Sequence, residues 1–95
     1  MNAFGTRVRE LRIRRGWKLI DLARQVGKTA GYISRVETQG ELPNPLFVCA
    51  LAEALRANPR ELLDTAKDDL LRQTEQSVTE RHAGALALFR KSRRM

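Results

Sequence analysis

The chain has 95 residues and a net charge of +7, with 42 % hydrophobic and 5 % aromatic residues. This length fits one domain with a single core and leaves no room for a large catalytic cleft. Without a signal core or an apolar run of roughly 20 residues, we expect a cytoplasmic protein that neither spans nor binds a membrane. Cys49 is the single cysteine, which excludes an intrachain disulfide and a cysteine-rich zinc site. We expect it to be buried on a helix.

Helix formers dominate the sequence and β-branched runs are absent, so the composition predicts an all-α fold. The charge is uneven: residues 1–40 carry nine basic against three acidic residues, residues 41–80 four against eight, and residues 81–95 five against none. A cationic first block is the electrostatic pattern of nucleic-acid binding. A solvated charged surface is the alternative, above all for the tail, because terminal basic runs are common.

The first expected helix covers Ala3–Arg15 and ends at Gly16. Its buried stripe, with i, i+4 and i+7 spacing, consists of Phe4, Val8 and Leu11. The second expected helix covers Leu19–Gln25, and Gly27 after it can take the positive φ that ends a helix sharply. Trp17, between the two helices, is expected to fill the core rather than to stack on a base.

The third expected helix covers Ala30–Thr38, with Thr29 as its N-cap. On the preceding helix Ala23 is small enough to let this helix approach closely. The facing apolar positions, three or four residues apart, are Leu22, Val26, Ile33 and Val36. Two short helices crossing at a tight turn are the pattern of a DNA-binding helix-turn-helix. The residues left pointing outward, toward a major groove, are Ala30, Gly31, Ser34 and Arg35.

The loop TQGELPNP precedes a fourth expected helix, which begins at Asn44-Pro45 and runs to about Arg56. Its expected core face consists of Phe47, Leu51, Ala52 and Leu55. Asn58 to Glu61 form a capping-box sequence that begins a fifth helix. The expected apolar positions of this helix are Leu62, Leu63, Ala66 and Leu70.

Beyond Leu71 the pattern weakens, and Ser77 to Glu80 indicate a second capping box and a sixth helix. Apolar residues of that helix are Val78, Ala85, Leu86 and Phe89, ahead of the basic terminus KSRRM. Alone it would be marginal in water, so we expect it to dock on its own domain, on a second copy or on another protein.

Four segments, FGTRVRELRIRRGW, DLARQVG, YISRVE and LAEALRANPRELL, carry a family resemblance over Phe4 to about Leu63. In this order they resemble the lambda-repressor-like (Cro-type, XRE) helix-turn-helix family of phage repressors and bacterial regulators. The resemblance implies a five-helix DNA-binding domain in residues 1–66 and a C-terminal helical extension in residues 67–95 for dimerisation or partner binding. It further implies a homodimer on a near-palindromic operator, with half-sites about 34 Å apart and the third helix in the major groove.

The resemblance assigns base reading to Ala30, Gly31, Ser34 and Arg35. Of these, Arg35 can make a bidentate contact to guanine, whereas Ala30 and Gly31 have no side-chain donor. The phosphate contacts that we expect are Lys18, Lys28, Thr29, Tyr32, Arg24, Gln39 and Asn44. For Tyr32, a ring packed at the helix flank is the alternative.

Leu19 stands where the family often has a phosphate-contacting Gln, and two lysines also depart from the family pattern. Lys18 stands where the family has a capping Ser or Thr, and Lys28 stands where an apolar residue is usual. Both offer a point charge to a phosphate instead. The resemblance also implies a structural ion pair between Arg12 and Glu37, 25 residues apart, with two unpaired surface charges as the alternative.

An enzyme is the weakest interpretation, because His82 is the sole histidine and Ser34 has no nearby base in sequence. We expect no catalytic, metal or cofactor site. The strongest alternative to a plain transcriptional repressor is an antitoxin, which would bind a toxin through residues 67–95 while the helix-turn-helix represses their shared promoter. Truncation after about Ala66 would distinguish the two roles. Loss of the dimer would indicate a dimerisation arm, whereas loss of the partner alone would indicate a toxin-binding arm.

Overall fold

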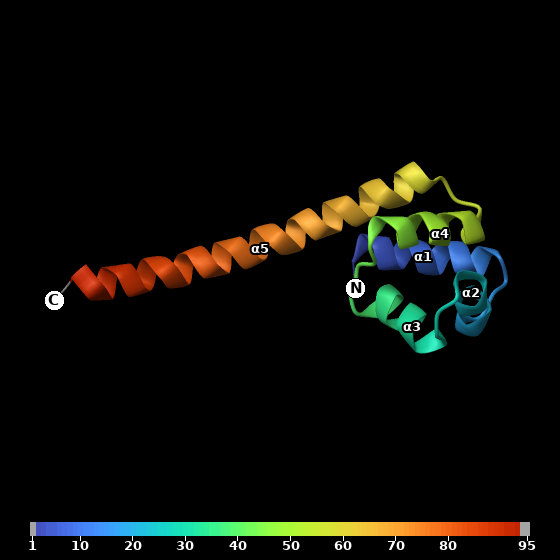
Figure 1. Cartoon of the computed structure of the whole chain (residues 1–95), viewed down its shortest axis with the longest axis horizontal. Coiled ribbons are helices and arrows are strands. Elements are labelled where there is room, and N and C mark those ends of the chain that lie inside the picture. Colours follow the sequence, from blue (N-terminus) through green and yellow to red (C-terminus); the bar gives the residue numbers. More distant parts are fainter. Residues whose placement is uncertain (1, 94–95) are drawn as a thin grey trace.

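The computed structural model describes the backbone of residues 2–93 and the side chains of residues 2–76. It consists of five helices: α1 (Ala3–Arg14), α2 (Leu19–Val26), α3 (Ala30–Thr38), α4 (Pro45–Leu55) and α5 (Pro59–Arg93). Figure 1 shows α1 to α4 gathered in a bundle from which α5 extends to one side. Residues 2–93 contain no strand, so the predicted all-α class is confirmed over this part of the chain. The first helix ends one residue earlier and the second one residue later than expected.

Local sequence sets the helix ends as predicted. Thr29 caps α3 through Oγ1, which accepts a hydrogen bond from the backbone N–H of Tyr32 at 3.1 Å. Asn44 caps α4 in the same way, because its Oδ1 accepts from the N–H of Phe47 at 2.9 Å. Gly27, with φ 67°, ends α2 in the left-handed conformation that glycine adopts without steric cost. The turn between α2 and α3 is therefore specified by its own residues.

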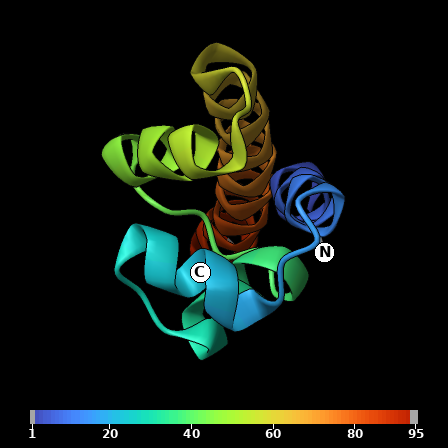
Figure 2. The same ribbon diagram turned by 90° about the vertical axis from the view of Figure 1, so that its right-hand side faces the viewer.

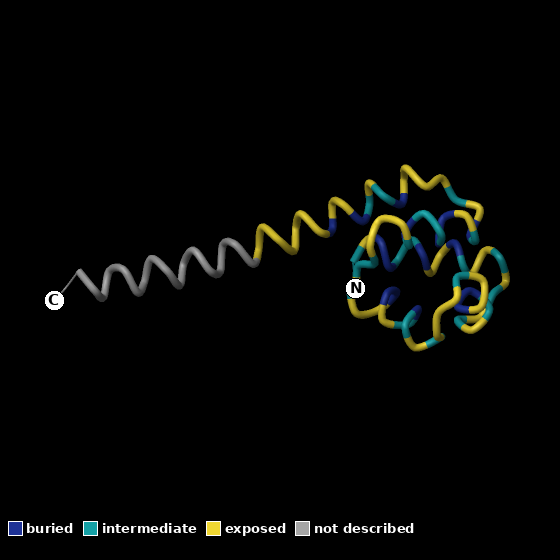
Figure 3. Tube along the Cα trace, in the orientation of Figure 1, coloured by how far each residue is buried: buried dark blue, intermediate teal, exposed yellow. Residues whose placement is uncertain are grey.

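The core lies where α1 to α4 and the first turns of α5 meet, as the end-on view in Figure 2 and the buried segments in Figure 3 show. It contains Phe4, Val8, Leu11, Leu22, Ala23, Ile33, Val36, Val48, Leu51, Ala52, Leu55, Leu62 and Ala66. On α4 the expected core face is wrong by one position, because Val48 is buried while Phe47 is half-buried against the core. Trp17 packs on the core from its edge, and Cys49 is half-buried rather than fully buried.

α5 is one continuous helix from Pro59 to Arg93, so the expected start of a sixth helix at Ser77 is wrong. The physical reason is that no proline or glycine interrupts the chain between Pro59 and Gly84. The side chains expected to dock or to form the tail lie outside the described residues, namely Val78, His82, Ala85, Leu86, Phe89 and the segment KSRRM. Leu70, expected on the apolar face, is exposed, and residues 70–76 are exposed throughout.

Asp69 is buried although its position suggests a surface charge. Its Oδ2 accepts a hydrogen bond from the backbone N–H of Phe4 at 2.7 Å, so α5 caps the N-terminus of α1. One turn further, Gln73 Nε2 donates to the carbonyl oxygen of Gly40 at 3.3 Å. Both contacts lie beyond residue 66, where we expected the DNA-binding domain to end. The first turns of α5 past that point thus belong to the packed structure.

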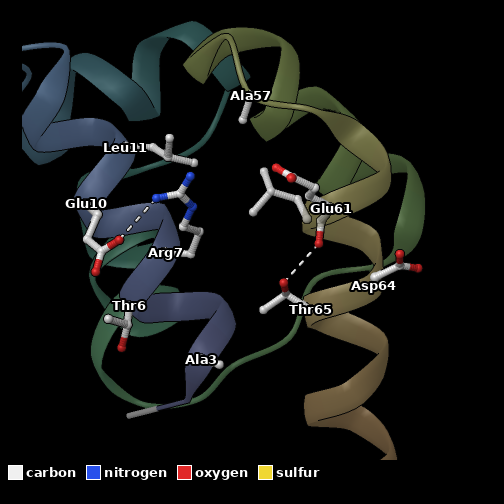
Figure 4. A pocket seen from close by; sticks show the side chains of 10 residues that line it. Ala3, Thr6, Arg7, Glu10, Leu11, Ala57, Glu61, Asp64 and Thr65 are labelled. Atoms are coloured by element: carbon white, nitrogen blue, oxygen red, sulfur yellow. Dashed lines mark hydrogen bonds and ion pairs between the residues drawn. The ribbon is translucent and has the colours of Figure 1, made fainter.

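A groove of about 640 Å³ runs between α1 and the first turns of α5 (Figure 4). Two interactions of its lining residues lie within single helices: Arg7 Nη1 lies 3.2 Å from Glu10 Oε2, and Thr65 Oγ1 donates to the Glu61 carbonyl oxygen at 2.9 Å. None of the site residues predicted from the sequence lines this groove.

In the part of the chain that the structure describes, no helix is both long enough and apolar enough to cross a membrane.

Candidate nucleic-acid interface

α3 has one face in the core and one face toward solvent. Ile33 and Val36 are fully buried, whereas Gly31 and Arg35 are exposed. The other two predicted base-reading residues, Ala30 and Ser34, are half-buried at the edges of the same outer face. The helix therefore presents a narrow strip of four residues, of which Arg35 alone has a long hydrogen-bonding side chain.

A buried ion pair fixes the end of α3 to α1. Arg12 Nε lies 2.8 Å from Glu37 Oε2, and Arg12 Nη2 lies 3.0 Å from Glu37 Oε1. The third guanidinium nitrogen, Nη1, donates to the carbonyl oxygen of Trp17 at 2.8 Å. Glu37 is 2 % exposed, and a buried carboxylate persists only when it is paired and hydrogen-bonded. This pair joins three segments of the chain behind the outer face of α3.

Gly5 brings the main chains of α1 and α3 into direct contact. A Cβ atom at this position would lie 2.8 Å from the carbonyl oxygen of Glu37 and closer still to that of Val36. Any larger residue would push α1 away from α3. The Arg12–Glu37 ion pair and the Gly5 contact lie at the same end of α3. Together they fix the position of α3 relative to the bundle.

Arg35 is held from one side by an acidic residue of the following loop. Its Nε lies 2.9 Å from Glu41 Oε2, and the side chains of both residues are about half-exposed. On its other side the Arg35 guanidinium carbon lies 5.6 Å from the centroid of the Tyr32 ring, within cation–π range. Glu41 and Tyr32 thus restrict the position of the Arg35 side chain, which remains accessible from solvent.

A cationic and aromatic cluster lies beside Arg35. The rings of Tyr32 and Phe47 meet edge to face with centroids 5.6 Å apart, and Lys28 Nζ lies 5.6 Å and 5.3 Å from their respective centroids. The pKa of Tyr32 is raised, first because the side chain is partly buried and second because Glu41 is near, while Arg35 acts in the opposite direction. At neutral pH the phenol is therefore protonated and can donate a hydrogen bond.

A family model described as a helix-turn-helix domain matches residues 3–66. The chain belongs to this helix-turn-helix family. It is a DNA-binding regulator of the lambda-repressor-like type, and the family expected from the sequence is confirmed. The match ends at residue 66, before the Asp69 and Gln73 contacts of α5.

Two solved structures of other regulators are similar to this helix-turn-helix chain. The restriction-modification controller protein C.AhdI from Aeromonas hydrophila is 37 % identical with a TM-score of 0.57, and the alignment covers 62 % of this chain and 86 % of that one. The P22 c2 repressor protein, solved in complex with a synthetic operator, is 29 % identical with a TM-score of 0.60, over 65 % of this chain and 94 % of that one. The comparison with curated proteins gave no match.

The remaining predicted phosphate contacts of the helix-turn-helix lie on both of its helices and the adjoining loop. Lys18 is exposed at the N-cap of α2, where a lysine ammonium cannot accept a hydrogen bond; instead Asp21 Oδ2 accepts from the Lys18 backbone N–H at 2.8 Å. Arg24 is exposed in the last turn of α2 and Gln39 is exposed at the C-cap of α3. Asn44 is exposed, and its side-chain oxygen is already used in capping α4.

Sequence reasoning missed two residues of this surface, Glu41 and Phe47. Glu41 is the single acidic residue between Glu37 and Glu53, and that charge beside a cationic helix was the available signal. Its pairing with Arg35 depends on the path of the loop, which the sequence pattern does not determine. Phe47 was assigned to the core because of its helical spacing, whereas its ring is shared between the core and Tyr32.

Among the described residues, no group of three His, Cys, Asp or Glu side chains is placed to hold a metal ion. The chemistry that the described surface offers is hydrogen bonding, cationic charge and aromatic contact.

Proposed function

We propose that this regulator represses transcription by binding a near-palindromic operator in double-stranded DNA as a homodimer, with α3 in the major groove. The observation that carries the proposal is the outer face of α3, which holds exposed Arg35 while its inner face is buried and braced by the Arg12–Glu37 pair. A recognition helix must be held rigidly while its side chains remain free to reach base edges.

Each residue on this face has a distinct role in the proposal. Arg35 donates two hydrogen bonds to O6 and N7 of a guanine, a contact worth about 1–3 kcal/mol of discrimination. Ala30 and Gly31 have no side-chain donor and allow the helix to approach closely or to touch a thymine methyl group. Ser34 makes a weaker hydrogen bond at the edge. The operator is therefore read through few direct contacts.

The flanking polar residues bind phosphates in this proposal. Lys28 and Tyr32 form one contact group beside Arg35, and Lys18 forms another at the start of α2. Lower-ranked contacts are Arg24, Thr29, Gln39 and Asn44. Because each neutralised phosphate releases counterions, removal of one lysine reduces the slope of log K against log salt by about 1.

A selected-site binding experiment with the full chain tests the proposal. We expect a consensus with two-fold symmetry that contains a guanine in each half-site, because both copies of Arg35 read the same base. Arg35→Ala should abolish the preference for that consensus, whereas Lys28→Ala should weaken binding to all sequences alike. A selection without any consensus, or equal losses of specific and non-specific binding in Arg35→Ala, would contradict the assignment.

A second candidate function, partner binding by α5 as in an antitoxin, is favoured by one observation. Leu70 and Leu71 on α5 are 55 % and 48 % exposed, which is apolar surface suited to a second copy or to another protein. Asp69 and Gln73 contact the rest of the fold, so truncation after Ala66 would disturb it, whereas substitution of both Leu70 and Leu71 by serine in the full chain removes only the exposed apolar surface. If these leucines dimerise, the variant is a monomer. If they bind a toxin, the variant remains a dimer and loses only the partner that co-purifies from the native host.

A further inference from the structure

We propose that Glu41 is a positioning residue for Arg35 and thereby sets how sharply this protein discriminates between DNA sequences. The inference rests on the proposed function, in which Arg35 reads a guanine. It adds a residue outside the helix-turn-helix to the determinants of specificity.

The two paired arginines of the domain use their guanidinium groups differently. Arg12 uses all three nitrogens: two on Glu37 and one on the Trp17 carbonyl oxygen. Arg35 uses Nε on Glu41 at 2.9 Å, and within residues 2–76 its Nη1 and Nη2 form no hydrogen bond. The two terminal nitrogens are the edge that can bind O6 and N7 of guanine together. Glu41 therefore occupies the nitrogen that base reading does not require.

Glu41 also restricts a side chain that would otherwise be mobile. The Arg35 side chain is 51 % exposed, and exposed arginines occupy many rotamers. Glu41 holds it on one side, and the Tyr32 ring, 5.6 Å from its guanidinium carbon, limits it on the other. Restriction before binding reduces the side-chain entropy that DNA binding must remove.

The loop that carries Glu41 is itself anchored. The neighbouring Gly40 has φ 69° and its carbonyl oxygen accepts a hydrogen bond from Gln73 Nε2 of α5 at 3.3 Å. On the other side, Leu42 packs against the core. The Glu41 backbone is thus fixed between two attached residues, as the support of a positioning contact requires.

The carboxylate has a second effect, on binding that is independent of sequence. A negative charge beside the phosphate backbone weakens binding to every DNA, and this effect is largest at low salt. This charge effect is common to specific and non-specific DNA and cancels in the ratio of the two affinities. The positioning of Arg35 is therefore the effect of Glu41 that raises the ratio of specific to non-specific affinity.

The test measures that ratio for the full chain, with the selected consensus and with the same duplex after its guanine pairs are replaced. Glu41→Ala removes both the charge and the hydrogen-bond acceptor, and we expect the ratio to fall about fivefold while non-specific binding tightens. Glu41→Gln keeps an oxygen that accepts from Arg35 Nε, so its ratio should fall by less than about twofold.

Glu10→Ala is the matched control. It likewise removes one negative charge and one exposed ion pair, that of Arg7 and Glu10 at 3.2 Å, in the groove between α1 and α5 (Figure 4). We expect its specificity ratio to equal that of the unmodified chain.

The results distinguish a failure of the Glu41 inference from a failure of the base-reading role of Arg35. A ratio in Glu41→Ala equal to that of Glu10→Ala, or higher than that of the unmodified chain, would show that Glu41 competes with DNA for Arg35 or has no role, and would overturn the inference alone. If the unmodified chain selects no consensus, or if Arg35→Ala retains it, the base-reading role fails and this inference fails with it.

Discussion

Substitution of Gly5 by alanine tests how tightly α1 and α3 are packed. An added Cβ would lie 2.8 Å from the Glu37 carbonyl oxygen, about 0.6 Å inside an ordinary van der Waals contact of 3.4 Å, and closer still to Val36. Both neighbours are main-chain atoms, so no side-chain rotation relieves the overlap and the helices must separate. Overpacking of this kind costs about 1–3 kcal/mol, and here the upper end applies. Alanine recovers about 0.5–1 kcal/mol of helix propensity, so the net loss is about 2 kcal/mol.

Gly31→Ala is the matched control, because the same change on α3 meets a single atom, Thr29 Oγ1, at 4.0 Å. It should stabilise the fold by about 0.5–1 kcal/mol. Thermal unfolding followed by the fluorescence of Trp17, the sole tryptophan, measures both variants. We expect Tm to fall by roughly 8–16 °C for Gly5→Ala and to rise by roughly 2–8 °C for Gly31→Ala. Equal shifts, or an unchanged Tm for Gly5→Ala, would refute the close contact between α1 and α3.

Three further predictions concern buried or partly buried polar groups. Glu37→Gln leaves the Arg12 guanidinium without its counter-charge in a nearly buried site, and we expect urea denaturation to show a loss of about 3 kcal/mol. Asp69→Ala leaves the Phe4 N–H without its acceptor and should cost about 1–3 kcal/mol in the same assay, with Asn at position 69 restoring part of it. Tyr32, the sole tyrosine, should ionise above the ordinary tyrosine pKa in an absorbance titration, because burial favours the neutral phenol. The resulting stability is complete below that ordinary pKa and is lost as pH rises through the raised pKa of Tyr32; a midpoint at or below the ordinary value would contradict this.

The parts of the fold that depend on short-range chemistry followed from the sequence. Thr29 and Asn44 cap the helices that they were expected to cap, and Gly27 has the predicted positive φ. Contacts between distant segments did not follow from periodicity, because periodicity reports which face of a helix is apolar and not what that face meets; the Arg12–Glu37 pair was expected only from the family resemblance. Asp69 looks like a surface charge until α1 is placed beside it, and Glu41 looks like an ordinary loop residue until the loop path brings it to Arg35.

The candidate interface was predictable to a similar extent. The outer face of α3 could be named because its inner face is defined by two apolar residues at helical spacing, Ile33 and Val36, which are buried. The sequence did not predict that α5 continues without a break, because Ser77 to Glu80 match a capping box. The same residues can also lie inside a helix. Capping residues favour a helix start, but without a glycine or proline before them the helix continues.

The hydrogen bond from the Phe4 N–H to Asp69 spans 65 residues of sequence. During translation, α1 leaves the ribosome before α2 to α5, yet the acceptor for its N-terminal N–H is synthesised only after all the residues of the helix-turn-helix. A nascent chain that stops at the end of the matched family domain, residue 66, therefore has every residue that we propose to contact DNA and still has an incompletely capped α1. Premature termination at this point would yield a domain that is more easily unfolded and degraded, so the stability of α1 depends on synthesis of the part of α5 that lies beyond the family domain.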